Sequence, residues 1–414
     1  MTNDAKQAEA VGQPNAPPTR WFGKVVLGFG LASLLSDAGH EAGSAALPTL
    51  LATMAAAPAT LGLIEGLADG AVCLAKLFGG SLANRPAWRK PIAVTGYLVT
   101  GLSVCLYGLS HHWLHVLSAR ILGWLFRGLR SPSRSAMLVD AVPKTALGRA
   151  VGFHRAMDTV GAIVGPLLAS ALLLRMPLRH VFYCATVPGV LAALAFLLLV
   201  PGQKSPDRAS PPSFVRSLAG LPVPFRRFLW AVLAFGCGDF ARTLLILRAT
   251  QLLSPLDVPG GAATVAILLF SAHHAVAAVC ALAVGYWVDA RPAAARVLLA
   301  VGYGLGVVTA LVAAVGHPSV YWLVVLFVAA GMVTGIEETL ESVLCARLVP
   351  QSLRGTAFGA LSATNGLGDL VASCVVGLLW AYVGPQVAFG SAAVACALGT
   401  VLLVAVLGPT EPAH

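Results

Sequence analysis

The sequence predicts an all-α integral membrane protein with twelve transmembrane helices in two six-helix repeats. Three observations lead to this fold class. Hydrophobic residues make up 57% of the 414 positions and charged residues only 11%, whereas soluble domains carry about 25% charged residues. Uncharged apolar stretches of about 20 residues, the length that crosses roughly 30 Å of hydrocarbon as a helix, recur along the chain. Short motifs of the first half return in the second half at a steady spacing.

Hydropathy places six apolar spans on each side of a polar central stretch. They cover residues 24–53, 58–83, 92–110, 114–139, 150–174 and 180–200, then 228–252, 262–288, 295–316, 319–347, 356–382 and 386–408. We therefore expect an N-terminal bundle over 21–200 and a C-terminal bundle over 228–408. The intervening 201–227 is rich in Pro and Ser and predicts a flexible linker. The polar ends predict short tails at 1–20 and 409–414.

The basic residues of the connections lie mainly on one side of the predicted bundle. The opposite connections offer only Arg175 and Arg179. By the positive-inside rule this asymmetry places both termini and the linker in the cytoplasm, with the bundle in the inner cell membrane. The net charge of +10 thus reports topology, and no nucleic-acid partner is expected. The basic residues on the cytoplasmic side are Lys6, Arg20, Lys24, Arg85, Arg89, Lys90, Lys144, Arg149, Lys204, Arg208, Arg216, Arg226, Arg227, Arg291, Arg296, Arg347 and Arg354.

Three short motifs recur in order at offsets of 205 to 207 residues. Gly80-Ser-Leu-Ala-Asn84-Arg85-Pro86 matches Gly285-Tyr-Trp-Val-Asp289-Ala-Arg291-Pro292. Leu27-Gly-Phe-Gly30 matches Leu233-Ala-Phe-Gly236, and Val142-Pro143 with Gly152 matches Val349-Pro350 with Gly359. Parallel six-helix repeats with a substrate site between them near the membrane midplane are a transporter architecture.

These motifs resemble those of the major facilitator superfamily. The resemblance implies twelve helices, alternating access, and the exporting antiporter branch of the family. Asn84 stands where the family usually has Asp, while the second copy keeps Asp289, and Ala169 replaces the last glycine of the fifth-helix motif. The residues that carry the resemblance are Gly80, Asn84, Arg85 and Arg89 of the first loop motif, Arg120 of the fourth span, and Gly161, Gly165 and Pro166 of the fifth.

The first span carries three ionisable residues at membrane depth, Asp37, His40 and Glu41. Spacings of three and four place them on one helical face. Each charged residue at a helix centre costs about 2.5–3.5 kcal/mol on insertion scales, so such groups face a cavity or a partner. The resemblance implies that this helix lines the central cavity. Because burial favours the protonated carboxyl, the acids are candidates for proton coupling. Structural pairing is the alternative.

The fourth and tenth spans carry opposite charges at equivalent positions. Arg127, Arg130 and Arg134 form one stripe on the fourth, and at an offset of 207 the last two correspond to Glu337 and Glu341, beside Glu338. One hypothesis is that the two sets pair across the cavity in one state and separate in another. A second is that the glutamates bind a cation or proton. The alternative is pairing within each half, Arg134 with Asp140 or Arg127 with Asp37.

Three further acids lie within the spans. Asp158 follows two basic residues by one helical turn, which predicts a structural clasp or an inner gate. Asp239 and Arg242 are three residues apart and are expected to pair. Asp369 has no local partner in the sequence and is therefore a candidate for coupling.

The sequence thus predicts a proton-coupled antiporter that expels a small cationic solute, and the family resemblance implies that a monomer is sufficient. Aromatic residues are only 7% of the chain, which disfavours a bulky flat drug. Nucleophile motifs, phosphate loops and cofactor signatures are not recognised, so we expect neither an enzyme nor a cofactor.

Three alternatives remain at this stage. A transition metal or its chelate would be bound by Asp37, His40 and Glu41 with the glutamates opposite. An organic anion would be clamped by the arginines of the fourth span in a symporter. A non-transporting membrane sensor would bind its ligand without flux.

Overall fold

The computed structural model describes residues 21–54, 58–202, 214–256, 258 and 261–406. The predicted tails at 1–20 and 409–414 lie outside the described residues, as does 203–213 of the predicted linker. The remainder of 201–227 contains the short helix α7 (Phe214–Ala219) and the start of α8 at Val223.

The described chain is built of helices whose ends match the predicted spans to within six residues, except in the seventh. The first half contains α1 (Lys24–Thr53), α2 (Pro58–Leu82), α3 (Pro86–Leu109), α4 (Trp113–Asp140), α5 (Leu147–Leu173) and α6 (Leu178–Leu199). The second half contains α8 (Val223–Gly236), α9 (Arg242–Leu253), α10 (Ala262–Ala290), α11 (Ala294–Val315), α12 (Val320–Leu348), α13 (Arg354–Tyr382) and α14 (Pro385–Val406).

Eight segments of the described residues are helices long and apolar enough to cross a membrane. The helices α1, α2 and α4 are as long but are not among the eight, and they carry many of the charged side chains of the central cavity described below. The all-α membrane fold with two six-span halves is confirmed.

The span predicted at 228–252 is not one continuous helix in the structure, and that prediction is wrong. The helix breaks between α8 and α9, at Cys237–Ala241. Gly238 packs directly on α14, since a Cβ there would lie 2.4 Å from the carbonyl oxygen of Ala392. Glycine and aspartate are weak helix formers, and the Asp239 carboxylate accepts hydrogen bonds from Arg242 just past the break. An average of hydropathy over a window does not register such local contacts.

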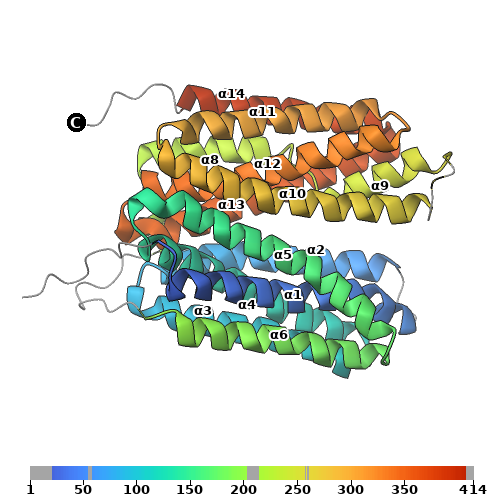
Figure 1. Cartoon of the computed structure of the whole chain (residues 1–414), viewed down its shortest axis with the longest axis horizontal. Helices are drawn as coiled ribbons and strands as arrows, with labels where there is room; N and C mark the ends of the chain where they lie inside the picture. The colour runs from blue at the N-terminus through green and yellow to red at the C-terminus, as the bar shows by residue number, and fades with distance from the viewer. Residues whose placement is uncertain (1–20, 55–57, 203–213, 257, 259–260, 407–414) are drawn as a thin grey trace, which may run out of the picture.

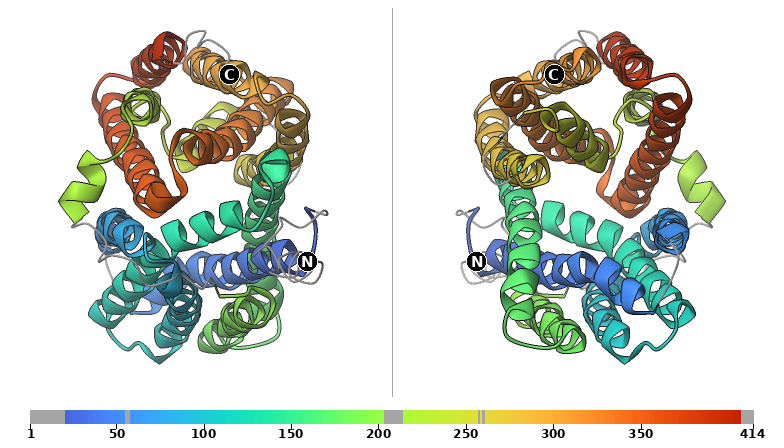
Figure 2. Two further views of the ribbon diagram at one scale, coloured as in Figure 1. Left: turned by 90° about the vertical axis from the view of Figure 1, so that its left-hand side faces the viewer. Right: turned by 90° about the vertical axis from the view of Figure 1, so that its right-hand side faces the viewer.

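The two halves lie side by side with their helices roughly parallel (Figure 1). Two helix pairs join them, α5 with α10 and α2 with α13, and they lie on opposite sides of the molecule when it is viewed along the helices (Figure 2). We call the end where α6 finishes and α8 begins the linker end, and the opposite end the far end. The interface therefore has an approximate twofold arrangement that follows the sequence repeat.

Glycines bring the halves into close contact at the linker end. A Cβ at Gly80 of α2 would lie 2.9 Å from the Cα of Gly359 in α13. The equivalent contact joins α10 and α5, where a Cβ at Gly285 would lie 2.3 Å from the carbonyl oxygen of Gly148. Gly80, Gly285 and Gly359 belong to the repeated motifs, so the sequence repeat contributes to both sides of the seal.

Candidate functional site

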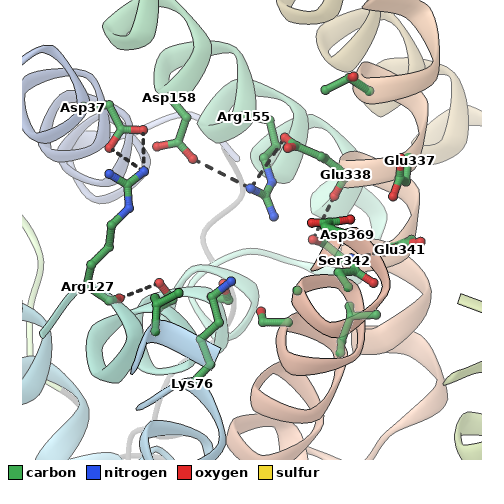
Figure 3. A pocket seen from close by; sticks show the side chains of 18 of the residues that line it. Asp37, Lys76, Arg127, Arg155, Asp158, Glu337, Glu338, Glu341, Ser342 and Asp369 are labelled. Carbon is green, nitrogen blue, oxygen red and sulfur yellow. Dashed lines mark hydrogen bonds and ion pairs between the residues drawn. The ribbon is translucent and has the colours of Figure 1, made fainter. Parts of the chain in front are cut away.

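A cavity of about 520 Å³ lies between the halves and is lined by both. Figure 3 shows acidic and basic side chains from α1, α2, α4 and α5 on one side and from α12 and α13 on the other. The ionisable residues that line it are Asp37, Glu41, Asp69, Lys76, Arg127, Arg130, Arg134, Arg155, Asp158, Asp239, Arg242, His274, Glu337, Glu338, Glu341 and Asp369.

The two walls of this cavity differ in charge. The N-terminal half contributes five basic and four acidic side chains, a formal charge of +1, whereas the C-terminal half contributes one basic and five acidic side chains, a formal charge of −4. The single basic residue of the C-terminal wall is Arg242. Charge of one sign in a water-filled cleft with low-dielectric walls raises the local concentration of ions of the opposite sign. The C-terminal wall therefore favours a cation.

Most charges of the N-terminal wall are paired within the molecule. Arg127 of α4 lies 3.3 Å from Asp37 of α1, the within-half pairing that the sequence offered as an alternative. Asp158 of α5 lies 3.6 Å from Arg134 and 3.9 Å from Arg155. Asp158 thus contacts Arg155 one turn back, as its spacing predicts, and its role as a clasp or a gate stays a prediction.

One ion pair of the cavity joins the two halves. Arg155 of α5 lies 3.6 Å from Glu338 of α12 and, as Figure 3 shows, reaches toward both Asp158 and Glu338. Because Asp158 and Glu338 belong to different halves, this guanidinium carries electrostatic contact across the cavity.

The predicted pairing of Arg134 with Asp140 is wrong. Asp140 accepts hydrogen bonds from Arg89 at 2.7 Å and from Arg354 of α13. Six residues separate Arg134 and Asp140, which places them on different faces of α4. Arg134 instead donates to Ser33 of α1 at 2.9 Å.

The opposite charges of α4 and α12 do not pair across the cavity in this structure. The Arg130 guanidinium lies 3.9 Å from the ring centre of Tyr97 and donates to Ser36 at 3.0 Å. Glu341 accepts hydrogen bonds from the Tyr303 hydroxyl at 2.5 Å and the Asn365 amide at 2.7 Å. Pairing in another conformation remains a hypothesis.

The three ionisable residues predicted on α1 do not converge. Asp37 and Glu41 line the cavity, but the buried His40 ring lies 4.1 Å from that of Trp124. Within the part of the chain that the structure describes, no group of three or more His, Cys, Asp or Glu side chains is arranged to hold a metal ion. We therefore do not propose Asp37, His40 and Glu41 as a metal site.

On the C-terminal wall, three acids of the cavity remain without a basic contact among the described residues. Arg242 pairs with Asp239 at 2.5 Å, as their spacing predicts. Glu337, Glu341 and Asp369 have no such ion pair. Asp369 is exposed to the cavity, which agrees with its lack of a local partner in the sequence.

The repeated loop motif caps two helices of the opposite half. Asn84 accepts a hydrogen bond from the backbone N–H of Thr356, at the start of α13, at 3.1 Å. Asp289 accepts from the backbone N–H groups of Gly148 and Arg149, at the start of α5, at 2.7 and 2.8 Å. A helix N-terminus carries partial positive charge, so both caps hold the linker end closed.

The remaining motif residues have structural surroundings. Arg89 is buried and donates to the Ala83 carbonyl at 2.5 Å, whereas Arg85 is exposed. Arg120 donates to Ser44 of α1 at 2.8 Å. Gly161 and Gly165 lie one helical turn apart, just before Pro166, and let α5 approach α1. A Cβ at Gly161 would lie 2.5 Å from an α1 carbonyl oxygen, and one at Gly165 would lie 2.7 Å from another.

Sequence reasoning missed the neutral partners of these charges, above all Tyr303 and Asn365. A signal was present, because Tyr97 and Tyr303 are 206 residues apart, the spacing of the repeat. Each contacts a charged residue of the helix that follows it, Arg130 or Glu341.

The two caps support a prediction about the closed linker end. Asn84→Asp is expected to stabilise it by about 0.3–1 kcal/mol, and Asp289→Asn to destabilise it by a similar amount or more, because a carboxylate interacts favourably with a helix N-terminus. Distances between spin labels on the exposed Lys144 and Arg291 would report the open fraction. Equal open fractions in both variants and the wild type would rule out this electrostatic role.

Two bundles of six spans, related by an internal repeat and enclosing a charged cavity between them, define a secondary membrane transporter. The Major Facilitator Superfamily model matches residues 29–290 and 252–414. The chain therefore belongs to the Major Facilitator Superfamily, and it is a transporter rather than an enzyme.

Similar proteins include an uncharacterized MFS-type transporter of Methanocaldococcus jannaschii, 27% identical over 405 residues, with 96% of this chain and 99% of the relative covered. The multidrug resistance protein MdtL of Salmonella heidelberg is 23% identical over 254 residues, covering 55% of this chain and 63% of that protein. Among solved structures, a bacterial homologue of the iron transporter ferroportin in an outward-facing state superposes with a TM-score of 0.76 at 14% identity, covering 92% and 98% of the two chains. The last similarity concerns the fold alone.

Proposed function

We propose that this transporter is a proton-coupled antiporter that exports a small cationic solute by alternating access. The observation that carries the proposal is the acidic C-terminal wall, with five carboxylates against the single Arg242. Weak similarity to a multidrug resistance protein and the fifth-helix motif, Gly161 to Pro166, agree with export.

The proposed cycle follows from the contacts at the linker end. On the positive-inside pattern we propose that this end, with both termini, lies in the cytoplasm. In this proposal the protein works as a monomer in the inner membrane. The described inter-half hydrogen bonds and ion pairs gather toward it, from Asn84–Thr356 to Arg155–Glu338. In this conformation the cation site is closed toward the cytoplasm. Breaking the contacts opens the cavity to the cytoplasm, where the solute enters.

The cation is held by Glu337 and Asp369 in this proposal. Both line the cavity, and neither accepts a hydrogen bond from a protein donor among the described residues. Their oxygens are therefore available to a ligand. A proton that enters from the far end exchanges for the solute, because protonation of a carboxylate on this wall lowers the negative charge that attracts the cation.

The test is proton flux in inverted vesicles that hold an acid interior. Divalent metals and their chelates, organic cations such as tetramethylammonium, and organic anions are added in turn. We expect an organic cation to discharge the gradient in the wild type, and Glu337→Gln to reduce the response about ten-fold or more, since one lost charge-assisted contact is worth about 1.5–3 kcal/mol. Arg227→Gln is the control, because Arg227 is exposed on α8 away from the cavity. A wild type that binds ligand but moves no protons would overturn antiport and favour a sensor.

A second candidate is an organic anion, and Arg130 favours it. The residue is only 1% exposed, and its Nε and one terminal nitrogen have no hydrogen-bond acceptor. A buried guanidinium with unused donors suits a carboxylate or phosphate group of a substrate. Acidification of the vesicle interior when an organic anion is added in the same assay, and loss of this response in Arg130→Gln, would establish symport in place of cation antiport.

A further inference from the structure

We propose that Glu341 is the carboxylate that binds and releases the coupled proton, at a site separate from the cation-binding Glu337 and Asp369. The inference rests on the proposed antiport. Glu341 lines the cavity although only 1% of the residue is exposed. Its two oxygens accept hydrogen bonds from Tyr303 of α11 and Asn365 of α13, at 2.5 and 2.7 Å.

The direct partners of Glu341 are both neutral. A carboxylate is stabilised by such donors, but its charge is not cancelled by them. When ionised, Glu341 is therefore a buried net charge, and when protonated it is a neutral acid whose other oxygen still accepts a hydrogen bond. A group with two tolerated protonation states in a fixed position is what proton exchange requires.

The other half of the molecule shows the contrasting arrangement. Counting back 207 residues from Glu341 and Asn365 gives Arg134 and Asp158, which form an ion pair at 3.6 Å. The equivalent position in the N-terminal half thus has a compensated charge on an arginine, which does not lose its proton in proteins. Only the C-terminal copy places an exchangeable proton at this position.

The charged groups around Glu341 link its proton to the interface. The charged residues of the same cavity that interact electrostatically with it are Asp239 from the α8–α9 connection, Arg155 from α5, Asp369 from α13 and Glu337 one turn earlier on α12. Arg155 is the cation of this set, and it comes from the opposite half. The ionised carboxylate attracts Arg155 and supports its inter-half ion pair with Glu338. Protonation removes that attraction, so proton binding favours separation of the halves at the linker end.

The cation site differs from this proton site in whether its carboxylate oxygens already accept hydrogen bonds from the protein. Glu337 and Asp369 accept no protein hydrogen bond among the described residues, whereas both oxygens of Glu341 are occupied. A ligand cation therefore contacts Glu337 and Asp369 first. The proton requires no space and reaches the buried Glu341 from the water of the cavity.

The first test needs no substrate. The full chain in liposomes is titrated with pH while the infrared carboxylic acid C=O band is recorded. We expect a titrating band that disappears in Glu341→Gln and persists in Glu337→Gln. Tyr303→Phe should raise the proton affinity of the band about ten-fold, because the carboxylate loses a charge-assisted donor. A band unchanged in Glu341→Gln, or unmoved in Tyr303→Phe, would overturn the assignment.

The second test separates coupling from transport, with tetramethylammonium as the probe because it carries no exchangeable proton. Glu341→Gln should still exchange this cation between the two sides, while proton-driven flux falls about ten-fold or more, as a lost general acid–base group implies. Loss of both activities in Glu341→Gln would refute separate sites. A wild type without cation flux would refute the antiport itself, and the infrared result would then decide the role of Glu341 alone.

Discussion

Asp140→Asn is expected to destabilise the closed linker end by about 3–5 kcal/mol, the cost of removing one partner of a buried ion pair. The Asp140 side chain is 1% exposed and its Arg89 partner 2%. The carboxylate also accepts from Arg354 of the other half. Asparagine leaves two largely buried guanidinium groups, those of Arg89 and Arg354, without a counter-charge. Arg354 then no longer has an ionic contact with Asp140 that holds the two halves together.

The measurement is the distance distribution between spin labels on Lys144 and Arg291, together with thermal unfolding. We expect the open population to rise at least ten-fold, since 1.4 kcal/mol is a factor of ten in an equilibrium constant. Arg354→Gln is the matched control, because it removes the inter-half contact but keeps the pair between Arg89 and Asp140. Its effect should be smaller. A distance distribution in Asp140→Asn that matches the wild type would show that this carboxylate does not join the halves.

Gly359→Leu is expected to lower transport about ten-fold to one hundred-fold while the protein remains folded. A Cβ at Gly359 would lie 2.7 Å from the carbonyl oxygen of Lys76 and 2.8 Å from the Cα of Gly80. Both atoms belong to the α2 backbone, which does not move aside as a side chain does. Overpacking of this kind costs about 1–3 kcal/mol, and here the cost applies only when the linker end is closed.

A substitution on the same helix provides the control. A Cβ at Gly377 of α13 would meet no atom within 4 Å, so Gly377→Leu should leave both flux and the spin-label distances unchanged. In Gly359→Leu the labels should report a persistently open linker end. Normal flux in Gly359→Leu would show that the close contact of α2 and α13 is not part of the cycle.

Much of the fold was predictable because the constraints act locally along the chain. Membrane spans follow from the length of apolar stretches, and the two halves follow from motifs that recur at 205 to 207 residues. Asp239 and Arg242 pair as predicted, because helical spacing brings residues three apart together. The break between α8 and α9 was not predicted, since it depends on the approach of α14 to Gly238.

The candidate site divides in the same way. That charged residues of α1, α4 and α12 face a cavity or a partner followed from the cost of exposing them to lipid, and a common cavity was what the family resemblance implied. Which charges pair did not follow, because the partners of Asp140 lie 51 and 214 residues away in sequence, on α3 and α13. The sequence alone thus determined the membrane architecture and the charge content of its interior. Only the tertiary structure decided that Glu341 meets neutral donors while Arg134 meets an acid, because contacts between helices depend on their relative rotation and separation.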